Sequence, residues 1–153
     1  MDKVLVTLLL IIAGVVCSLV VINAVYPAIT GSSGALADAA GKINDRIRSQ
    51  IEVVEIAHQS TNVYIWVKNV GSSRIGAIES SDIFWGPQGN FARITYGGST
   101  APYWDYIIEN DTRWGPTATL KITIHLASPP SGTNFFKIVI PNGISSEKSY
   151  STS

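Results

Sequence analysis

The pattern of hydrophobic positions changes twice along the chain, and the first part is apolar on every face. Residues 4–25 carry no charge, and the only polar side chains among these 22 residues are those of Thr7, Ser18 and Asn23. At about 1.5 Å of rise per residue, such a helix is roughly 33 Å long, which matches a hydrocarbon core of about 30 Å. The pattern therefore predicts a transmembrane helix over residues 1–25.

Two other structures fit a long apolar segment: a buried helix of a soluble protein and a cleaved signal peptide. The length and purity of the segment disfavour the first. The apolar region of a signal peptide spans only about 7–15 residues, and the small residues at 32–35 are the nearest approach to a cleavage site. Because the sequence starts at Met1 with this segment included, we expect the helix to be retained.

Charges beside the apolar segment favour a cytoplasmic N-terminus. Lys3 and the α-amino group precede it, whereas residues 26–41 contain one charge, that of Asp38. The positive-inside rule then places the rest of the chain outside the cell membrane. The sequon that begins at Asn110 agrees with an external domain and makes Asn110 a candidate for glycosylation.

Helical spacing returns after Pro27 and the Gly- and Ser-rich residues 30–34, which are expected to kink or break the helix. A kinked helical stalk is predicted over residues 26–50. A narrow apolar stripe recurs there at steps of four and three, and it consists of Leu36, Ala40, Ile43, Ile47 and Ile51. The stripe either packs on the domain that follows or joins copies of the chain, so these five residues are candidates for self-association.

After Gln50 the hydrophobic period falls from 3.6 to 2, which indicates β-strands. Gly-, Pro-, Ser- and Asn-rich turns separate the predicted strands, and no helical pattern lies between them. Clear alternation covers residues 62–70, 119–126 and 134–140, and weaker alternation covers 51–56, 75–84, 90–96 and 103–108.

Six or seven short strands without intervening helices predict an antiparallel sandwich. The expected fold is an N-terminal transmembrane and stalk α-helix followed by an all-β, immunoglobulin-like sandwich over residues 51–145. The Cys–Trp–Cys core of antibody domains is absent from the sequence. Residues 146–153 are expected to form a frayed tail.

Composition removes several classes of function. The net charge is zero, 14% of the residues are charged and no basic run occurs, so nucleic-acid binding is not expected. The single cysteine, Cys17, lies in the apolar segment, which excludes a disulfide framework and a cysteine-based metal site in the domain.

The sequence offers little for catalysis, and we predict no enzyme, catalytic residue, cofactor or metal site. His58 lies in a polar segment expected to be a loop, and His125 alternates with apolar residues and so should face solvent. No Gly-x-Ser-x-Gly elbow occurs in the sequence. One acidic group fits either a calcium site or an exposed loop, and it consists of Asp105, Glu109, Asn110 and Asp111.

Aromatic residues are concentrated between residues 85 and 114, and core packing is expected to take about half of them. An exposed remainder would form a contact face, since Trp and Tyr supply a large contact area at low entropic cost. A protein-interaction module is favoured over an enzyme, and a carbohydrate platform is a further option. The candidates for surface contact are Trp85, Tyr103, Trp104 and Trp114.

Short motifs resemble those of archaeal surface-filament proteins. Residues 63–73, VYIWVKNVGSS, are similar to the first sandwich strand and turn of archaellins and their accessory proteins, where an apolar strand ends in K-N-x-G. Residues 83–87, together with Trp104, Trp114 and the closing segment 138–143, resemble the FlaG (ArlG) family of archaellum stator proteins, in the superfamily of FlaF, FlaG and archaellins.

The resemblance implies a mechanical function without catalytic residues. A FlaG-like protein would assemble through its β domain as the archaellum stator, between the membrane and the S-layer. Its partners would be copies of itself, the archaellum stator protein F, the S-layer and the lipid bilayer. An exposed edge strand would mediate the assembly, since unpaired edges invite pairing.

Two other functions remain open. Archaellins and type IV pilins, which this chain resembles in plan, carry a basic leader that ends in Gly before the apolar helix. Pilins also usually carry a Glu early in that helix. Here Met-Asp-Lys precedes the helix and residues 4–25 contain no Glu, which favours an accessory membrane protein. In a processed chain the apolar helix would instead form the core of an archaellin or pilin filament. A glycan-binding or adhesion module is the third function.

Overall fold

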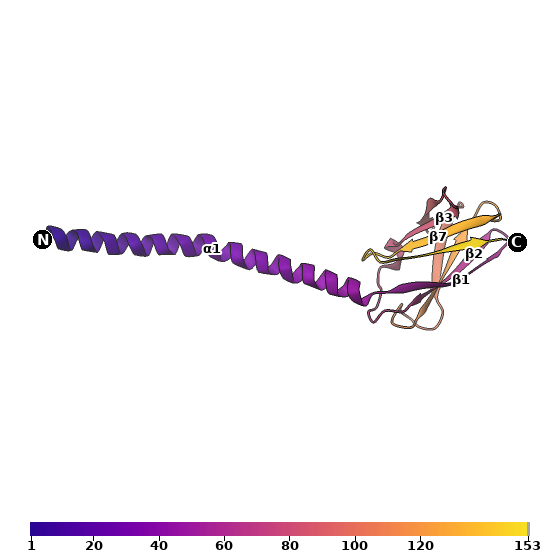
Figure 1. The fold of residues 1–153 in the computed structure, drawn as a ribbon, viewed down its shortest axis with the longest axis horizontal. Helices are drawn as coiled ribbons and strands as arrows, with labels where there is room; N and C mark the ends of the chain where they lie inside the picture. Colours follow the sequence, from indigo (N-terminus) through magenta and orange to yellow (C-terminus); the bar gives the residue numbers. More distant parts are fainter. Residues whose placement is uncertain (153) are drawn as a thin grey trace. The chain divides into compact units, whose positions relative to one another are not determined.

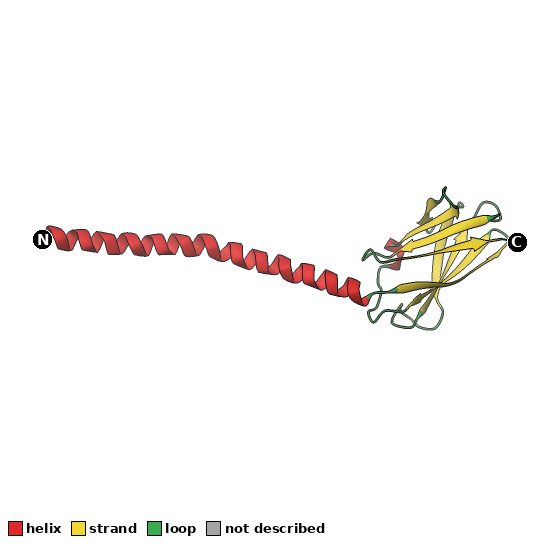
Figure 2. Cartoon of the chain, viewed as in Figure 1, coloured by secondary structure: helices red, strands yellow, loops and turns green. Residues whose placement is uncertain are grey.

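The structure, a computed structural model, describes residues 1–152, apart from the side chains of residues 28, 29 and 31–33. One long helix, α1 (Asp2–Arg48), leads into eight strands and a short 3₁₀ helix, η1 (Ile78–Ser80) (Figure 1; Figure 2). The strands are β1 (Ile51–Gln59), β2 (Asn62–Asn69), β3 (Asp82–Pro87), β4 (Ala92–Tyr96), β5 (Tyr103–Ile108), β6 (Thr119–His125), β7 (Thr133–Val139) and β8 (Ser145–Ser151). The chain divides into two compact units, residues 1–42 and 43–153.

Helix α1 continues through Pro27 and residues 30–34, so the predicted alternative of a break is wrong. A proline removes one backbone hydrogen bond but does not oblige a helix to end. The hydroxyl of Thr30 donates to the carbonyls of Tyr26 and Pro27, at 3.1 and 3.2 Å. The kink and the boundaries of the transmembrane and stalk segments remain predictions.

The strands form one sheet in the order β1-β2-β6-β5-β4-β3-β7-β8, and the described pairings are antiparallel except that of β4 with β5. The sheet folds over on itself as a nearly closed sandwich (Figure 1). We call β1, β2, β6 and β5 the first half-sheet and β4, β3, β7 and β8 the second. The prediction of an all-β sandwich is confirmed, with one parallel pair as a correction.

The parallel pair arises where the chain crosses between the half-sheets. Only the last two residues of β4 pair with the first two of β5, in the register Thr95 with Tyr103 and Tyr96 with Trp104. The two strands therefore run in the same direction, and residues 97–102 move the chain sideways from one half-sheet to the other. The alternation of apolar and polar residues along β4 or β5 does not indicate whether the two strands pair in parallel.

Three local predictions are wrong. The expected frayed tail is strand β8, which pairs with β7 from Ser145 to Ser151. Its sequence is polar because an edge strand leaves most of its side chains in water, so no hydrophobic alternation indicated a strand. The expected strand at 75–84 is divided, since the left-handed backbone of Ala77 (φ 50°) precedes η1 and β3 starts only at Asp82. His58 lies within β1, not in a loop.

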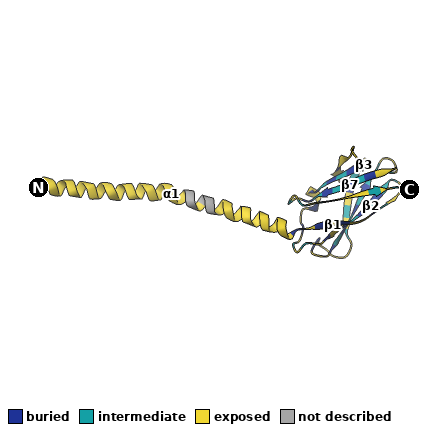
Figure 3. Cartoon of the chain, in the orientation of Figure 1, coloured by how far each residue is buried: buried dark blue, intermediate teal, exposed yellow. Residues whose placement is uncertain are grey.

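The inner faces of both half-sheets build the core, which appears as the dark blue segments of the domain in Figure 3. The alternation predicted for β2, β6 and β7 is confirmed by burial on one face of each strand. Each such aliphatic side chain contributes about 1.5–3 kcal/mol when fully buried. The side chains with no exposed surface include Val63, Ile65, Val67, Ile83, Leu120, Ile122, Ile124, Phe136 and Ile138.

Candidate functional site

The apolar side chains described in the first part of α1 are exposed. The most apolar stretch of residues 2–27, 18 residues long, has a mean hydropathy of 3.1 and is entirely unburied, as the exposed helix in Figure 3 shows. Among the described residues, this is the one helix long and apolar enough to cross a membrane. Because about 25 cal/mol is at stake for each Å² of apolar surface left in water, such a helix requires an apolar surrounding.

Two of the three polar side chains of residues 4–25, the hydroxyls of Thr7 and Ser18, are bonded inside the helix. The hydroxyl of Thr7 donates to the carbonyl of Lys3 at 2.7 Å, and that of Ser18 donates to the carbonyl of Gly14 at 2.8 Å. A hydroxyl satisfied by the preceding turn brings no unpaired polar group into hydrocarbon. The helix therefore suits a bilayer in its hydrogen bonds as well as in its length.

The end of α1 is bonded to the loop that follows β2. The carbonyl of Arg48 accepts hydrogen bonds from the backbone N–H groups of Ser72 and Ser73, at 2.8 and 3.2 Å. The carbonyl of Gln50 accepts two more bonds from the same loop, at 2.9 and 3.0 Å. Carbonyls at a helix end lack partners in the helix, so loop 70–73 both caps α1 and ties it to the domain.

Two residues hold this loop in place, Asn69 and Gly71. The fully buried amide of Asn69 donates to the carbonyls of Ser73 and Trp114, at 2.9 and 3.2 Å, and its oxygen accepts from the N–H of Gly71 at 3.0 Å. A β-carbon at position 71 would lie 2.5 Å from the carbonyl oxygen of Arg48, so only glycine fits. We call Asn69, Gly71 and the last turn of α1 the anchor junction.

Sequence reasoning missed the anchor junction. Asn69 and Gly71 are the Asn and Gly of the K-N-x-G motif, which the sequence presents only as a likeness to other proteins. Their role depends on contacts with Arg48 and Trp114, which lie far away in the sequence. A buried Asn followed two residues later by Gly is the signal that was available, since Asn and Gly together are typical of tight turns.

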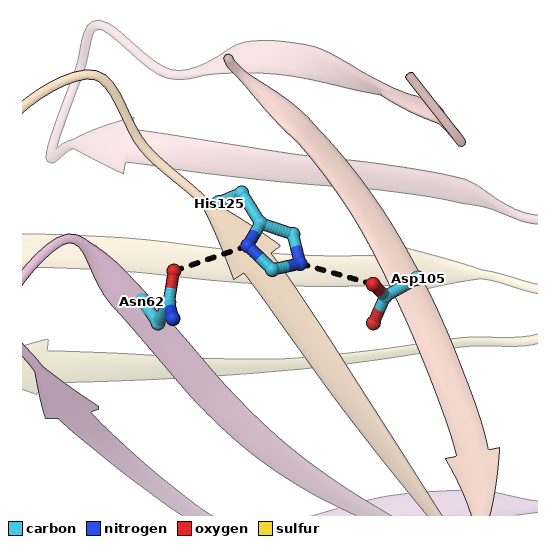
Figure 4. A network of polar contacts seen from close by, with 3 residues as sticks. All are labelled: Asn62, Asp105 and His125. Atoms are coloured by element: carbon cyan, nitrogen blue, oxygen red, sulfur yellow. Dashed lines mark hydrogen bonds and ion pairs between the residues drawn. The ribbon is translucent and has the colours of Figure 1, made fainter. Parts of the chain in front are cut away.

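The outer face of the first half-sheet carries a polar network centred on His125 (Figure 4). Its Nδ1 lies 3.1 Å from Oδ1 of Asn62, and its Nε2 lies 3.0 Å from Oδ2 of Asp105. The ring of Tyr103 stacks on the imidazole, with the centroids 4.4 Å apart. The expected outward direction of His125 is confirmed, but the imidazole is held on three sides.

The structure gives the carboxylates of the acidic group separate partners. Asp105 pairs with His125, Glu109 accepts from the indole N–H of Trp66 at 3.1 Å, and Asp111 accepts from the backbone of Thr112. Each carboxylate is thus used locally and points to a different neighbour. Within the described residues, no three His, Cys, Asp or Glu side chains are grouped to hold a metal ion.

Asn110 remains available for glycosylation. Its residue is exposed, and its Oδ1 accepts a hydrogen bond from the backbone N–H of Thr119 at 2.8 Å. A glycan is attached to the side-chain nitrogen, so this hydrogen bond and the modification do not compete. The structure therefore places the sequon in an accessible loop, and its modification remains a prediction.

A second polar pair connects η1 to β5. The phenol of Tyr106 donates a hydrogen bond to the carboxylate of Glu79. This bond holds the pKa of Glu79 below its ordinary value. Burial, and then the nearby carboxylate, raise the pKa of Tyr106 to about 12. The hydrogen bond thus favours the state in which the phenol of Tyr106 is neutral and the carboxylate of Glu79 is ionised.

Three of the four predicted surface contacts are wrong. Trp85, Trp104 and Trp114 expose 5%, 1% and 1% of their surface, so they pack the core. Their large apolar surface gains more from burial than from exposure, and an interface would have to unfold the domain to reach them. Tyr103 is half-buried against His125 on the outer face and remains a candidate for contact.

The predicted self-association stripe divides into two groups. Leu36, Ile43 and Ile47 expose 70%, 58% and 77% of their surface, and Ala40 is exposed as well. Ile51 is 5% exposed and belongs to the core, because the helix has ended and β1 turns this side chain inward. The prediction is wrong for Ile51 and untested for the other four.

The comparisons with known proteins agree with this architecture. The family model of archaeal-type flagellin matches residues 3–149, which include both the helix and the domain. The chain belongs to the archaeal-type flagellin family. A protein of Archaeoglobus fulgidus described as uncharacterized is 30% identical over 154 residues, which cover 93% of each chain.

Two solved structures are similar to this member of the family. The archaellum periplasmic stator protein FlaG from Sulfolobus acidocaldarius has a TM-score of 0.61 and 27% identity, over 67% of this chain and 99% of FlaG. The complex of FlaF and FlaG from the same organism gives 0.60 and 27%, over 66% of this chain and 88% of the matched one. The resemblance to the FlaG family is confirmed, and these relatives are structural components, not enzymes.

Proposed function

We propose that this chain is a membrane-anchored component of the archaellum motor that assembles as a stator between the membrane and the S-layer. The observation that carries the proposal is the similarity to the periplasmic stator protein FlaG, which covers 99% of the chain in that solved structure. A stator needs a fixed anchor, a rigid body and a connection that transmits force between them. Each requirement has a counterpart in this chain.

The anchor is the apolar part of α1. A helix of 47 residues is about 70 Å long, more than twice the hydrocarbon thickness of about 30 Å. Residues 1–25 cross the bilayer with Lys3 in the cytoplasm, and residues 26–50 form the stalk. The β domain then lies on the outer side, where Asn110 is accessible to glycosylation.

The anchor junction supports transmission of force. A flexible linker between anchor and domain would absorb rotation, whereas loop 70–73 bonds the last turn of α1 directly to the domain. Asn69 and Gly71 allow this close approach. Torque applied to the β domain therefore reaches the helix through backbone hydrogen bonds.

The partners follow from the same proposal. The structure of a FlaF–FlaG complex supports the archaellum stator protein F as a partner. The S-layer is the fixed structure beyond it, and the bilayer covers α1. Copies of the chain associate, and the exposed stripe of Leu36, Ala40, Ile43 and Ile47 is one surface for that contact.

A filament subunit is the second candidate function. The family model of archaeal-type flagellin favours this function, because it matches both the apolar helix and the β domain. A flagellin-type filament subunit would have the same order of helix and domain. In a filament, neighbouring helices would cover the apolar side chains of α1 in place of lipid. Surface adhesion has less support, since three of the four aromatic side chains proposed for contact are buried.

Fractionation of intact cells separates these functions. Surface filaments are sheared off and purified, and the abundance of this protein in them is compared by mass spectrometry with that in washed membranes. Retention in the membranes supports the stator. Enrichment as a main filament component would overturn it and assign the apolar helix to a filament core.

A further inference from the structure

The outer face of the second half-sheet exposes a group of three phenylalanines, Phe84 on β3, Phe91 before β4 and Phe135 on β7. The ring centroids of Phe84 and Phe91 are 6.2 Å apart, and those of Phe91 and Phe135 are 5.1 Å apart. Phe91 exposes 44% of its surface, and the other two are half-buried. None of the three belongs to the core cluster, and we call them the phenylalanine patch.

The fold brings these rings together through Gly86. Gly86 pairs with Phe135 across β3 and β7, and a β-carbon on it would lie 2.7 Å from the Cα of Phe91. The glycine therefore lets the chain before β4 fold back over the strand, which places Phe91 beside Phe84 and Phe135. A folded-back segment that gathers three apolar rings on the surface is typical of a contact surface, since such rings supply most of the energy of protein interfaces.

Two other surfaces of the domain already make contacts within the chain. The two edge strands face each other, and side chains bridge them: the N–H of Val53 donates to Ser146 Oγ at 3.2 Å, and Lys148 Nζ donates to the carbonyl of Val54 at 2.7 Å. On the first half-sheet, the ammonium group of Lys121 lies 4.9 Å from the ring centroid of Tyr64. The predicted assembly through a free edge thus has less support than assembly through the patch.

Charges around the patch alternate from strand to strand. Arg93 on β4 pairs with Asp82 on β3 at 2.6 Å, and Lys137 on β7 pairs with Glu147 on β8 at 3.3 Å. In the order β4, β3, β7, β8 the signs are therefore plus, minus, plus, minus. Arg93, Phe84, Lys137 and Glu147 also lie in one row across the strands.

This charge pattern is complementary to itself. Consider a twofold axis that runs parallel to the strands, midway between β3 and β7, in the plane of the contact. It places β4 of one copy over β8 of the other, and β3 over β7. Arg93 then faces Glu147 of the second copy, and Asp82 comes within diagonal reach of Lys137. Opposite charges meet at each of these positions, around rings that exclude water.

We propose that the phenylalanine patch is a face-to-face contact between two copies of this chain. The inference deepens the proposed function, because it names the surface through which the anchored chains associate. The inference rests on the proposed function only for where in the cell the contact forms. The contact itself can be measured on the purified chain.

The first test measures association of the full chain in detergent micelles by sedimentation velocity. The variants are Phe84→Lys and Phe135→Lys, and the matched control is Ile107→Lys, at a 58% exposed residue on the opposite face. We expect each phenylalanine variant to weaken association at least about tenfold, as at interface hot spots, and the control to leave it unchanged. Denaturation midpoints check that each variant folds.

The second test needs no change in the patch itself. In a Cys17→Ser background, chains carrying Arg93→Cys are mixed with chains carrying Glu147→Cys, and disulfides are formed by mild oxidation. The proposed axis predicts a crosslink between the two kinds of chain and little within either kind. Crosslinking of Arg93→Cys chains with one another would contradict the axis.

Outcomes of these tests are separate from those of fractionation. Unchanged association in both phenylalanine variants, or a monomeric chain at all concentrations, overturns the contact even if the protein remains in the membrane fraction; the patch would then serve a different protein. Enrichment in sheared filaments overturns the stator proposal and leaves the contact to be judged by the crosslink.

Discussion

The two units of this chain are stabilised by different surroundings. In residues 1–42 the described hydrogen bonds connect neighbours within four positions, and the described apolar side chains are exposed. In residues 43–153 the strands bond across long distances in sequence and bury their apolar side chains in a core of their own. The helix therefore depends on lipid or on other chains, whereas the domain contains its own apolar interior. Changes in one unit should leave the other intact, and the following substitutions test this separation.

The largest effect is expected from Phe136→Ala, which removes a fully buried ring from the core. Truncation of a buried aromatic side chain costs roughly 3–5 kcal/mol of unfolding free energy. Chemical denaturation of the full chain in micelles measures the loss, with Ile107→Ala as a control at an exposed apolar residue. Membrane retention should be unchanged, and a loss of retention would contradict the separation of the units.

A charge in the helix should have the opposite consequence. Ile12→Arg places a cation near the middle of the apolar segment, where insertion costs about 2.5–3.5 kcal/mol. We expect alkaline extraction to release this variant from membranes, while Ile12→Leu stays bound. The denaturation midpoint of the β domain should match that of the unchanged chain. If it falls, the domain relies on the helix for stability.

Gly71→Ala tests the contact between the last turn of α1 and the loop after β2. Its β-carbon would lie 2.5 Å from the carbonyl oxygen of Arg48, so the loop must shift, at a cost of roughly 1–3 kcal/mol. Gly76→Ala is the control, since its β-carbon meets no atom within 4 Å. Faster hydrogen exchange at the amides of loop 70–73, with little change in the core strands, is the expected result.

The smallest effect concerns the pair of Glu79 and Tyr106. Because the folded-state pKa of Glu79 is lowered, its contribution to stability is present at neutral pH and is lost as the pH falls through that lowered pKa. Because the pKa of Tyr106 is raised to about 12, its contribution is present below its ordinary pKa of about 10 and is lost as the pH rises toward 12.

Tyr106→Phe should remove the dependence on the phenol and reduce the dependence on Glu79, whose pKa a backbone hydrogen bond also lowers. Denaturation midpoints of the variant and the unchanged chain should differ slightly at neutral pH and converge in strong acid, where Glu79 is protonated. At high pH the phenol of Tyr106 ionises, and the unchanged chain should lose the stability that the neutral phenol contributes. A difference that persists undiminished in strong acid would mean that the phenol acts through packing and not through the carboxylate.

Sequence reasoning succeeded where the physical signal is local. Alternation located β2, β6 and β7, because residues two apart on a strand point to the same side and one side is buried. It failed for β8, since a polar edge strand shows no such contrast. The burial of Trp85 could have been predicted, because Ile83 lies two residues earlier on the same strand and faces the core.

The candidate sites were harder to predict than the fold. Nothing close in sequence to Asn69 indicates that its amide will donate to the carbonyl of Trp114 as well as to that of Ser73. The phenylalanine patch combines residues from β3, β7 and the segment before β4, and the order of the strands alone makes them neighbours. Aromatic content suggested a contact face, but most of the residues chosen for it are in the core.

The sequence by itself determined that an uncharged segment long enough to cross a bilayer precedes an all-β domain. These properties depend on length, charge and period, which are fixed within a few neighbouring residues. The tertiary structure alone decided which aromatic side chains face solvent, how Asn69 and Gly71 fasten the helix, and why Arg93 lies beside Asp82. Strand order and register bring those groups together from distant positions, and hydrophobic periodicity carries no information about which strands become neighbours.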